Sequence, residues 1–189
     1  DAILAAEDER YFHHKGVDYV GVARAALANF TQIGPRQGAS TITMQVARNF
    51  FLSREKTLTR KVNEMLLAFK IESSLTKEQI LELYINQIYL GQRAYGFASA
   101  ARIYYGKTLD GLSLGETAML AGLPKAPSSF NPVANPARAK LRQQYVLRRM
   151  REMGSISAAQ QADADKQQLV IKNELNEFAT RAEYIAEMV

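Results

Sequence analysis

The carboxylate of Glu7 is the first side chain whose type and setting suit catalysis. It follows directly on the apolar residues Ile3 to Ala6. Because apolar surroundings raise the pKa of a carboxyl group, a carboxylate at such a position suits proton transfer. The alternative is that Glu7 and Asp8 are solvated or pair with a nearby cation such as Arg10. Spacing alone favours this alternative over acid–base chemistry.

The adjacent histidines His13 and His14 could suggest a metal site. Neighbouring residues on a helix point about 100° apart and rarely share one ion. We therefore expect His14 to be a structural hydrogen-bonding residue at the turn formed by Gly16.

A second polar group lies where a loop at Gly38 to Ser40 is expected to enter a helix. A helix N-terminus with free N–H groups and hydroxyls binds anions or sugar hydroxyls. Residues at helical steps then lie on one face. The polar residues of this group are Ser40, Thr41, Gln45, Arg48 and Asn49. Polar faces on surface helices are common, so this pattern alone is only a moderate indication of a site.

A third group combines cations with another carboxylate. Glu64 lies four residues after Arg60 and three after Lys61, so all three share one helix face. Lys56 lies four residues before Arg60 and extends the cationic row. A surface ion pair of this kind is worth only about 0.2–0.5 kcal/mol. The functional interpretation is a row of cations that grips a phosphate and holds Glu64.

The elements that must position these groups are helices. Apolar residues recur at helical spacing and no stretch shows sustained two-residue alternation, so we expect an all-α domain. Three stripes are expected to border the core: Leu58, Val62, Met65, Leu66 and Phe69; Ile80, Leu83, Tyr84 and Ile88; Val146, Met150 and Met153. The predicted helix N-caps are Thr57, Thr76, Ser113 and Ser157, and Ser113 forms a capping-box pattern with Glu116.

Composition limits the classes of protein. The 189 residues suffice for one compact domain, and a net charge of +5 favours an anionic partner. The absence of cysteine excludes disulfides, thiolate metal sites and cysteine nucleophiles. From Tyr19 to about Leu58, Glu55 is the one acidic residue, and many apolar residues are accompanied by a few cations. That composition suits an anionic membrane surface, although composition alone favours an ordinary core.

Together, the order and spacing of these motifs resemble the peptidoglycan glycosyltransferase domain of class A penicillin-binding proteins across nearly the whole chain. The resemblance implies a lysozyme-like helical fold, residues 1–182, with a large globular lobe. It also implies a smaller membrane-associated jaw lobe, roughly residues 19–58. Residues 183–189 resemble the start of a linker toward a transpeptidase domain, so we expect a bifunctional parent protein.

The resemblance also implies a reaction. Lipid II would be polymerised into glycan strands by inverting transfer, with release of undecaprenyl pyrophosphate. Glu7 matches the catalytic base and Glu64 a second glutamate beside the pyrophosphate. The phosphate-binding cations would be Arg48, Lys56, Arg60 and Lys61, and the other polar substrate contacts Ser40, Thr41, Gln45 and Asn49. No tightly bound cofactor is implied, but a divalent cation, Mg²⁺ or Mn²⁺, at Glu64 is left open.

Three positions depart from the usual pattern of that family. Tyr11 stands where Phe is usual, Met44 replaces the first residue of a Gln-Gln pair, and Arg48 replaces a common Lys. None of these changes removes a predicted catalytic group.

The implied partners are lipid II, the growing strand, membrane lipids and other cell-wall synthesis proteins, with no nucleic acid. The implied location is the outer, periplasmic face of the bacterial inner membrane.

Three other functions remain open at this point. A lysozyme-like hydrolase or lytic transglycosylase would share the fold and a lone acidic residue, without needing the cationic row. A nucleic-acid binder is suggested by the basic residues Arg138, Arg142, Arg148, Arg149 and Arg151. A non-catalytic helical anion-binding module is the third.

Overall fold

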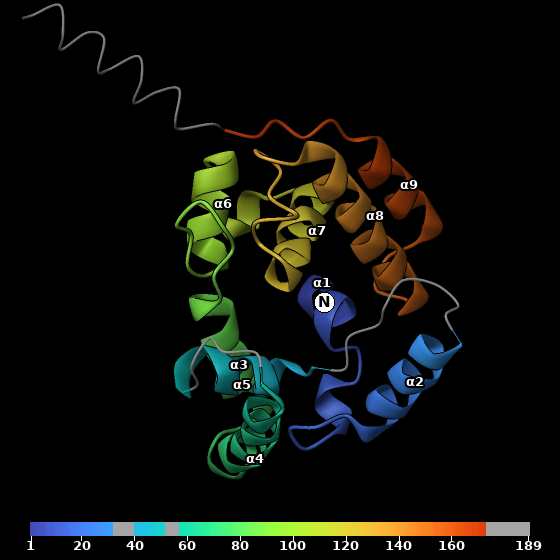
Figure 1. Ribbon diagram of the computed structural model, residues 1–189. Coiled ribbons are helices and arrows are strands. Elements are labelled where there is room, and N and C mark those ends of the chain that lie inside the picture. Colours follow the sequence, from blue (N-terminus) through green and yellow to red (C-terminus); the bar gives the residue numbers. More distant parts are fainter. Residues whose placement is uncertain (32–39, 52–56, 173–189) are drawn as a thin grey trace, which may run out of the picture. The chain divides into compact units, whose positions relative to one another are not determined.

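The computed structural model describes residues 1–31, 40–51 and 57–172. Within these ranges the chain is helical, with no strand beyond an isolated bridge between Tyr89 and Tyr95 (Figure 1). The predicted all-α class is therefore confirmed for the described residues. The α-helices are α1 (Ala2–Glu7), α2 (Tyr19–Phe30), α3 (Ile42–Phe51), α4 (Leu58–Ser74), α5 (Lys77–Gln87), α6 (Phe97–Tyr105), α7 (Leu114–Gly122), α8 (Pro136–Glu152) and α9 (Ala158–Lys166). Short 3₁₀ helices occupy Tyr11–His13, Leu109–Gly111 and Leu123–Lys125.

The chain divides into two compact units. The N-terminal unit comprises Asp1 and residues 3–88, and the C-terminal unit comprises Ala2 and the residues from Tyr89 onward. The predicted jaw, residues 19–58, belongs to the N-terminal unit, but its residues 32–39 and 52–56 lie outside the described residues. The predicted linker, residues 183–189, lies outside them as well. Jaw, linker and lysozyme-like arrangement therefore stay predictions.

Helix α3 forms the centre of the N-terminal unit, where it packs against α4 and α5. Its first six residues, from Ile42 to Ala47, are all buried. From α5, Ile80 and Tyr84 are buried, which confirms most of the predicted stripe on that helix, although Leu83 is exposed.

The predicted core-facing stripe of α4 is wrong for most of its residues, although Met65 packs against the buried core cluster that includes Ala68. Leu58 is 88% exposed and Leu66 60% exposed, whereas the buried residues of α4 are Glu64 and Ala68. Glu64 and Ala68 are four residues apart and lie on a different face of the helix from the apolar stripe. Hydrophobic periodicity marks an apolar face, but the packing partner decides which face is buried, and α3 packs on the face that carries Glu64.

A glycine allows the loop after α1 to approach α4. Gly16 has a φ of +83°, and a Cβ at this position would lie 3.0 Å from the carbonyl carbon and oxygen of Ala68. Only glycine adopts such a φ without strain, and here it also removes the clash. The loop that follows Glu7 is thereby held against α4.

The helix starts follow the sequence closely. Each of the four predicted N-caps accepts a hydrogen bond from the backbone N–H three residues later, which confirms all four: Thr57, Thr76, Ser113 and Ser157. The predicted capping box of Ser113 and Glu116 is also present. Such caps typically contribute about 0.5–2 kcal/mol each.

Helix α7 forms the centre of the C-terminal unit, packed against α6, α8 and α9 (Figure 1). Its small residues permit close approach, since a Cβ on Gly122 would lie 2.8 Å from Cγ of Arg142. Arg142 is buried, stacks on Tyr145 and donates from Nε to the Gly122 carbonyl oxygen. No described helix is both long and apolar enough to cross a bilayer.

The stability of the C-terminal unit is expected to depend on pH through Glu116. Burial raises the pKa of Glu116, but hydrogen bonds from Lys107 and Ser113 outweigh burial, so the pKa lies below its usual 4.5. A carboxylate with a lowered folded-state pKa stabilises the fold above its unfolded pKa, and the contribution is lost as the pH falls through the lowered value. Glu116→Gln should therefore lower the melting temperature near neutral pH. At acid pH the variant and the parent chain should have the same melting temperature.

Thermal unfolding at a series of pH values tests this expectation. Glu152, an exposed carboxylate paired with Arg149, provides the matched control, because Glu152→Gln removes an ion pair at the surface. If the difference in melting temperature between Glu116→Gln and the parent chain stays constant from neutral to acid pH, the stabilising role assigned to the Glu116 carboxylate is contradicted.

Candidate active site

Glu7 is held by a residue of α3. It is the last residue of α1, half-buried, and its Oε2 accepts a hydrogen bond from Nε2 of Gln45 at 3.0 Å. Gln45 is 4% exposed. The structure therefore brings a residue of the first group singled out in the sequence into contact with a residue of the second group, 38 positions further along the chain.

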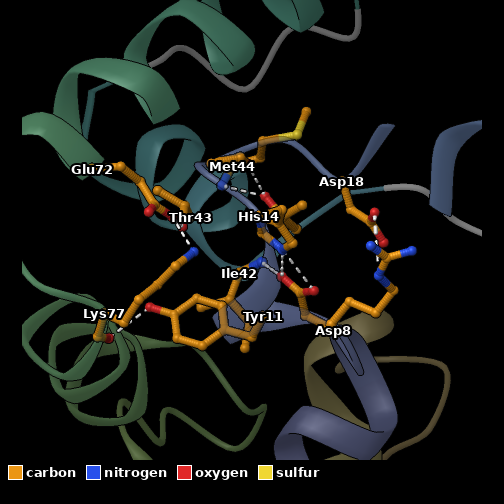
Figure 2. Close-up of polar contacts among 12 residues, drawn as sticks. Asp8, Tyr11, His14, Asp18, Ile42, Thr43, Met44, Glu72 and Lys77 are labelled. Atoms are coloured by element: carbon orange, nitrogen blue, oxygen red, sulfur yellow. Dashed lines mark hydrogen bonds and ion pairs between the residues drawn. The ribbon is translucent and has the colours of Figure 1, made fainter. Parts of the chain in front are cut away.

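The neighbouring carboxylate, Asp8, connects the end of α1 to the start of α3 (Figure 2). Its Oδ2 accepts a hydrogen bond from the backbone N–H of Ile42 at 3.0 Å. His14 Nε2 lies 3.0 and 3.1 Å from its two oxygens, and it is the donor because an ionised carboxylate only accepts. Asp8 is 7% exposed and pairs with His14, so it is not solvated, and its partner differs from Arg10 or Lys15, the cations considered in the sequence.

The adjacent histidines do not belong to a larger cluster of metal-ligating side chains in the part of the chain that the structure describes. No group of three or more His, Cys, Asp or Glu residues is placed there to bind an ion. His14 is a hydrogen-bonding residue, as expected, but Nε2 pairs with Asp8 and Nδ1 has no hydrogen-bond partner among the described residues, so it does not cap the turn at Gly16.

Glu64 is a buried carboxylate between two cations. It is 1% exposed, its Oε2 accepts a hydrogen bond from Lys61 Nζ at 2.8 Å, and its Oε1 lies 3.2 Å from Arg60 Nη1. The predicted sharing of one helix face is confirmed for these three residues. A buried charge is tolerated only when it is compensated, and here two cations compensate one carboxylate.

Lys61 connects this ion-paired group to the loop before α3. Its Nζ donates to Ser40 Oγ at 2.7 Å as well as to Glu64. Glu64 thus reaches Ser40 through Lys61, while Glu7 contacts Gln45 directly. Both carboxylates are connected to one short segment, residues 40–45.

Thr41 has a structural function. Its hydroxyl donates to the Gly16 carbonyl oxygen at 2.5 Å and accepts from the backbone N–H of Met44 at 3.1 Å, as a helix N-cap does. Arg48 and Asn49 lie in the last turns of α3, partly buried and exposed respectively. Lys56 lies outside the described residues. The assignment of these residues as substrate contacts stays a prediction.

A second polar network fixes α3 against α4 and α5 (Figure 2). Glu72 Oε1 accepts hydrogen bonds from Thr43 Oγ1 and Lys77 Nζ, each at 2.6 Å. Tyr11 donates its hydroxyl to the Lys77 carbonyl oxygen at 2.7 Å. Burial, with the nearby charges of Glu72 and Asp8, raises the pKa of Tyr11 well above its usual range, so the hydroxyl stays a donor.

Two residues at the site were not identified from the sequence. Asp8 was grouped with solvated carboxylates, although His14 six residues later offered it a partner. Tyr84 was assigned to the core, yet its hydroxyl donates to Gln45 Oε1 at 3.1 Å. The one sequence signal for Tyr84 was a polar hydroxyl in an otherwise apolar stripe.

Comparison with known proteins identifies the class to which this fold and site belong. Residues 1–151 match the family model described as Transglycosylase, so the chain belongs to the transglycosylase family and is a glycosyltransferase domain. Over its whole length it is 58% identical to penicillin-binding protein 1A of Neisseria gonorrhoeae, of which it covers 24%. The chain thus spans about a quarter of the length of that curated relative.

Two further relatives support the family. A Cupriavidus necator protein described as a candidate transglycosylase is 65% identical over 82% of this chain, which covers 67% of that protein. The fold resembles the crystal structure of penicillin-binding protein 1A from Haemophilus influenzae, with a TM-score of 0.51 and 40% identity over 60% of this chain and 18% of that one.

Proposed function

We propose that this domain polymerises lipid II into peptidoglycan strands at the outer face of the bacterial inner membrane. The family membership supports the reaction class. The observation that carries the proposal is the bridge of Lys61 between Ser40 and Glu64, which joins a cationic site to the segment that also holds Glu7 through Gln45.

Glu7 acts as the base. It takes the proton from the 4-hydroxyl of the acceptor N-acetylglucosamine, whose oxygen attacks the anomeric carbon of the lipid-linked sugar. The configuration inverts, since the acceptor approaches from the face opposite the leaving group. A base must point at the proton it removes, and the hydrogen bond from Gln45 supports that orientation.

The cations stabilise the leaving group. Breaking the bond to the anomeric carbon leaves the electron pair on the undecaprenyl pyrophosphate, which needs positive charge more than a proton. Arg60 and Lys61 supply this charge, and Arg48 and Lys56 belong to the same proposed set. Glu64 balances the charge of these two partly exposed cations, Arg60 and Lys61, and holds Lys61 toward Ser40.

Cations already pair with Glu64 and would compete with a metal ion for its carboxylate. Lys61 Nζ donates to Oε2, and Arg60 Nη1 lies 3.2 Å from Oε1, which accepts no hydrogen bond from the described residues. We assign no step to a metal and propose that no cofactor is tightly bound.

Exposed apolar side chains support contact with membrane lipids. They lie on α2, at the end of α3 and on α4: Tyr19, Val20, Leu27, Phe30, Phe50, Phe51, Leu58 and Leu66. Apolar residues beside cations favour insertion at an anionic membrane surface. These residues belong to the proposed jaw or border it.

Incubation of the chain with lipid II in detergent tests the function. Glycan polymer and free undecaprenyl pyrophosphate are expected, with equal rates in Mg²⁺, in Mn²⁺ and in a chelator. Cleavage of finished glycan without polymerisation would instead identify a hydrolase or lytic transglycosylase.

The nucleic-acid alternative loses part of its basis. Of the five arginines that suggested it, Arg142 is buried against Tyr145, and Arg149 is paired with Glu152. Tight, steeply salt-dependent DNA binding by a chain that leaves lipid II unchanged would restore it.

A further inference from the structure

Tyr84 connects α5 to the catalytic carboxylate through one intervening side chain. Tyr84 is 1% exposed, and its hydroxyl donates to Gln45 Oε1 at 3.1 Å. Gln45 in turn donates from Nε2 to Glu7 Oε2 at 3.0 Å. The path joins three helices, α5, α3 and α1, over sequence separations of 39 and 38 residues.

The two hydrogen bonds favour one orientation of the Gln45 amide. An ionised carboxylate only accepts, so the NH₂ group must face Glu7. The carbonyl oxygen then faces Tyr84, whose phenol is protonated at neutral pH and can donate to it. The reversed amide would bring its oxygen against the carboxylate of Glu7 and repel it. The hydroxyl of Tyr84 therefore favours the orientation that Glu7 requires.

We infer that Tyr84 is a positioning residue for Glu7, acting through Gln45. The inference rests on the proposed function, in which Glu7 is the base. It also changes the interpretation of Gln45, which was predicted to contact substrate. Gln45 is buried and hydrogen-bonded at both ends of its amide, so it holds Glu7 in place.

This arrangement has two consequences for turnover. A base must lie within hydrogen-bond reach of its proton, and misplacement by about 1 Å can cost about 10²-fold in rate. A hydrogen bond to the ionised form of a carboxylate also favours that form. Loosening the Gln45 amide should therefore slow the chemical step and make Glu7 easier to protonate.

Tyr84→Phe tests the inference, because it removes the hydroxyl and keeps the buried ring. We expect kcat in the lipid II assay to fall about 10-fold with KM changed less than about twofold, and the acid limb of the pH–rate profile to move to higher pH. Tyr104→Phe is the matched control. It removes another buried hydroxyl, which donates to the Leu90 carbonyl oxygen at 2.9 Å in the C-terminal unit. It should leave kcat and the pH profile unchanged.

A double-mutant cycle separates action through Gln45 from a general loss of packing. In a Gln45→Met background the amide is already absent, so adding Tyr84→Phe should change kcat by less than about twofold. If Tyr84→Phe lowers kcat as much in the Gln45→Met background as in the parent chain, the inference is overturned. Normal kcat and an unchanged pH profile in Tyr84→Phe alone would overturn it as well.

A titration that needs no turnover keeps this inference separate from the proposed function. In ¹³C NMR of the side-chain carboxyl groups, Tyr84→Phe should move the titration midpoint of Glu7 to higher pH, and Tyr104→Phe should not. If the parent chain fails to polymerise lipid II, the proposed function fails. If the midpoint of Glu7 is the same in parent and Tyr84→Phe, the coupling through Gln45 fails, whatever the activity.

Discussion

The Glu7→Gln variant is expected to lose lipid II polymerisation by about 10²- to 10⁴-fold, the range that a general base contributes. An amide cannot take up a proton near neutral pH, but its oxygen can still accept the hydrogen bond that Gln45 Nε2 now donates to Glu7. The fold and substrate binding should therefore persist. The measurements are kcat, binding of lipid II and thermal unfolding.

Glu9 provides the control for Glu7. It lies two residues away, is exposed and pairs with Arg24 at 3.6 Å. Glu9→Gln should retain kcat within about twofold, since exposed ion pairs of this kind contribute little. Normal turnover in Glu7→Gln would show that another group takes the proton, and the assignment of Glu7 as the base would be abandoned.

Glu64→Gln is expected to show the second-largest effect, a fall in kcat of about 10²-fold. The substitution leaves Lys61 and Arg60 without their buried counter-charge, so Lys61 no longer has a fixed position between Glu64 and Ser40. Stability should fall by about 1–2 kcal/mol, less than for a fully buried pair, because Lys61 and Arg60 keep contact with water.

A variant of Glu72 separates the effect on kcat from the effect on stability, because Glu72 lies on the same helix as Glu64. The side chain of Glu72 is 8% exposed, pairs with Lys77 at 2.6 Å and accepts a hydrogen bond from Thr43. Glu72→Gln should lower the melting temperature by a similar amount while kcat changes less than about twofold. Equal loss of activity in the Glu64 and Glu72 variants would mean that the rate reports damage to α4, and the proposed role of Glu64 would be withdrawn.

The helices and their starts could be predicted because their signals are local. An N-cap hydroxyl bonds a backbone N–H only three residues away, so Thr57, Thr76, Ser113 and Ser157 could be read directly from the sequence. For the same reason, the sequence could predict that Arg60, Lys61 and Glu64 lie together, since the helical period fixes which neighbours meet.

The buried face of α4 could not be predicted from its periodicity. Most of the apolar stripe, including Leu58 and Leu66, is exposed, and although Met65 packs against the core, the helix buries Glu64 completely. Burying a carboxylate is unfavourable unless cations compensate it, so a pattern of hydrophobicity alone assigns it to the surface. Only the approach of α3, with Ser40 reaching Lys61, shows why this face is the inner one.

Glu7 illustrates the division between what the sequence determines and what the fold decides. The sequence by itself determined the helical elements, the family and the choice of Glu7 and Glu64, because these depend on residue types at short or ordered spacings. Tertiary structure alone decided what surrounds Glu7: Gln45 from α3, Tyr84 behind it on α5, and the hydrogen bond from the start of α3 to the neighbouring Asp8. Such contacts join residues 34 to 39 positions apart, and their geometry depends on how whole helices pack rather than on any local pattern.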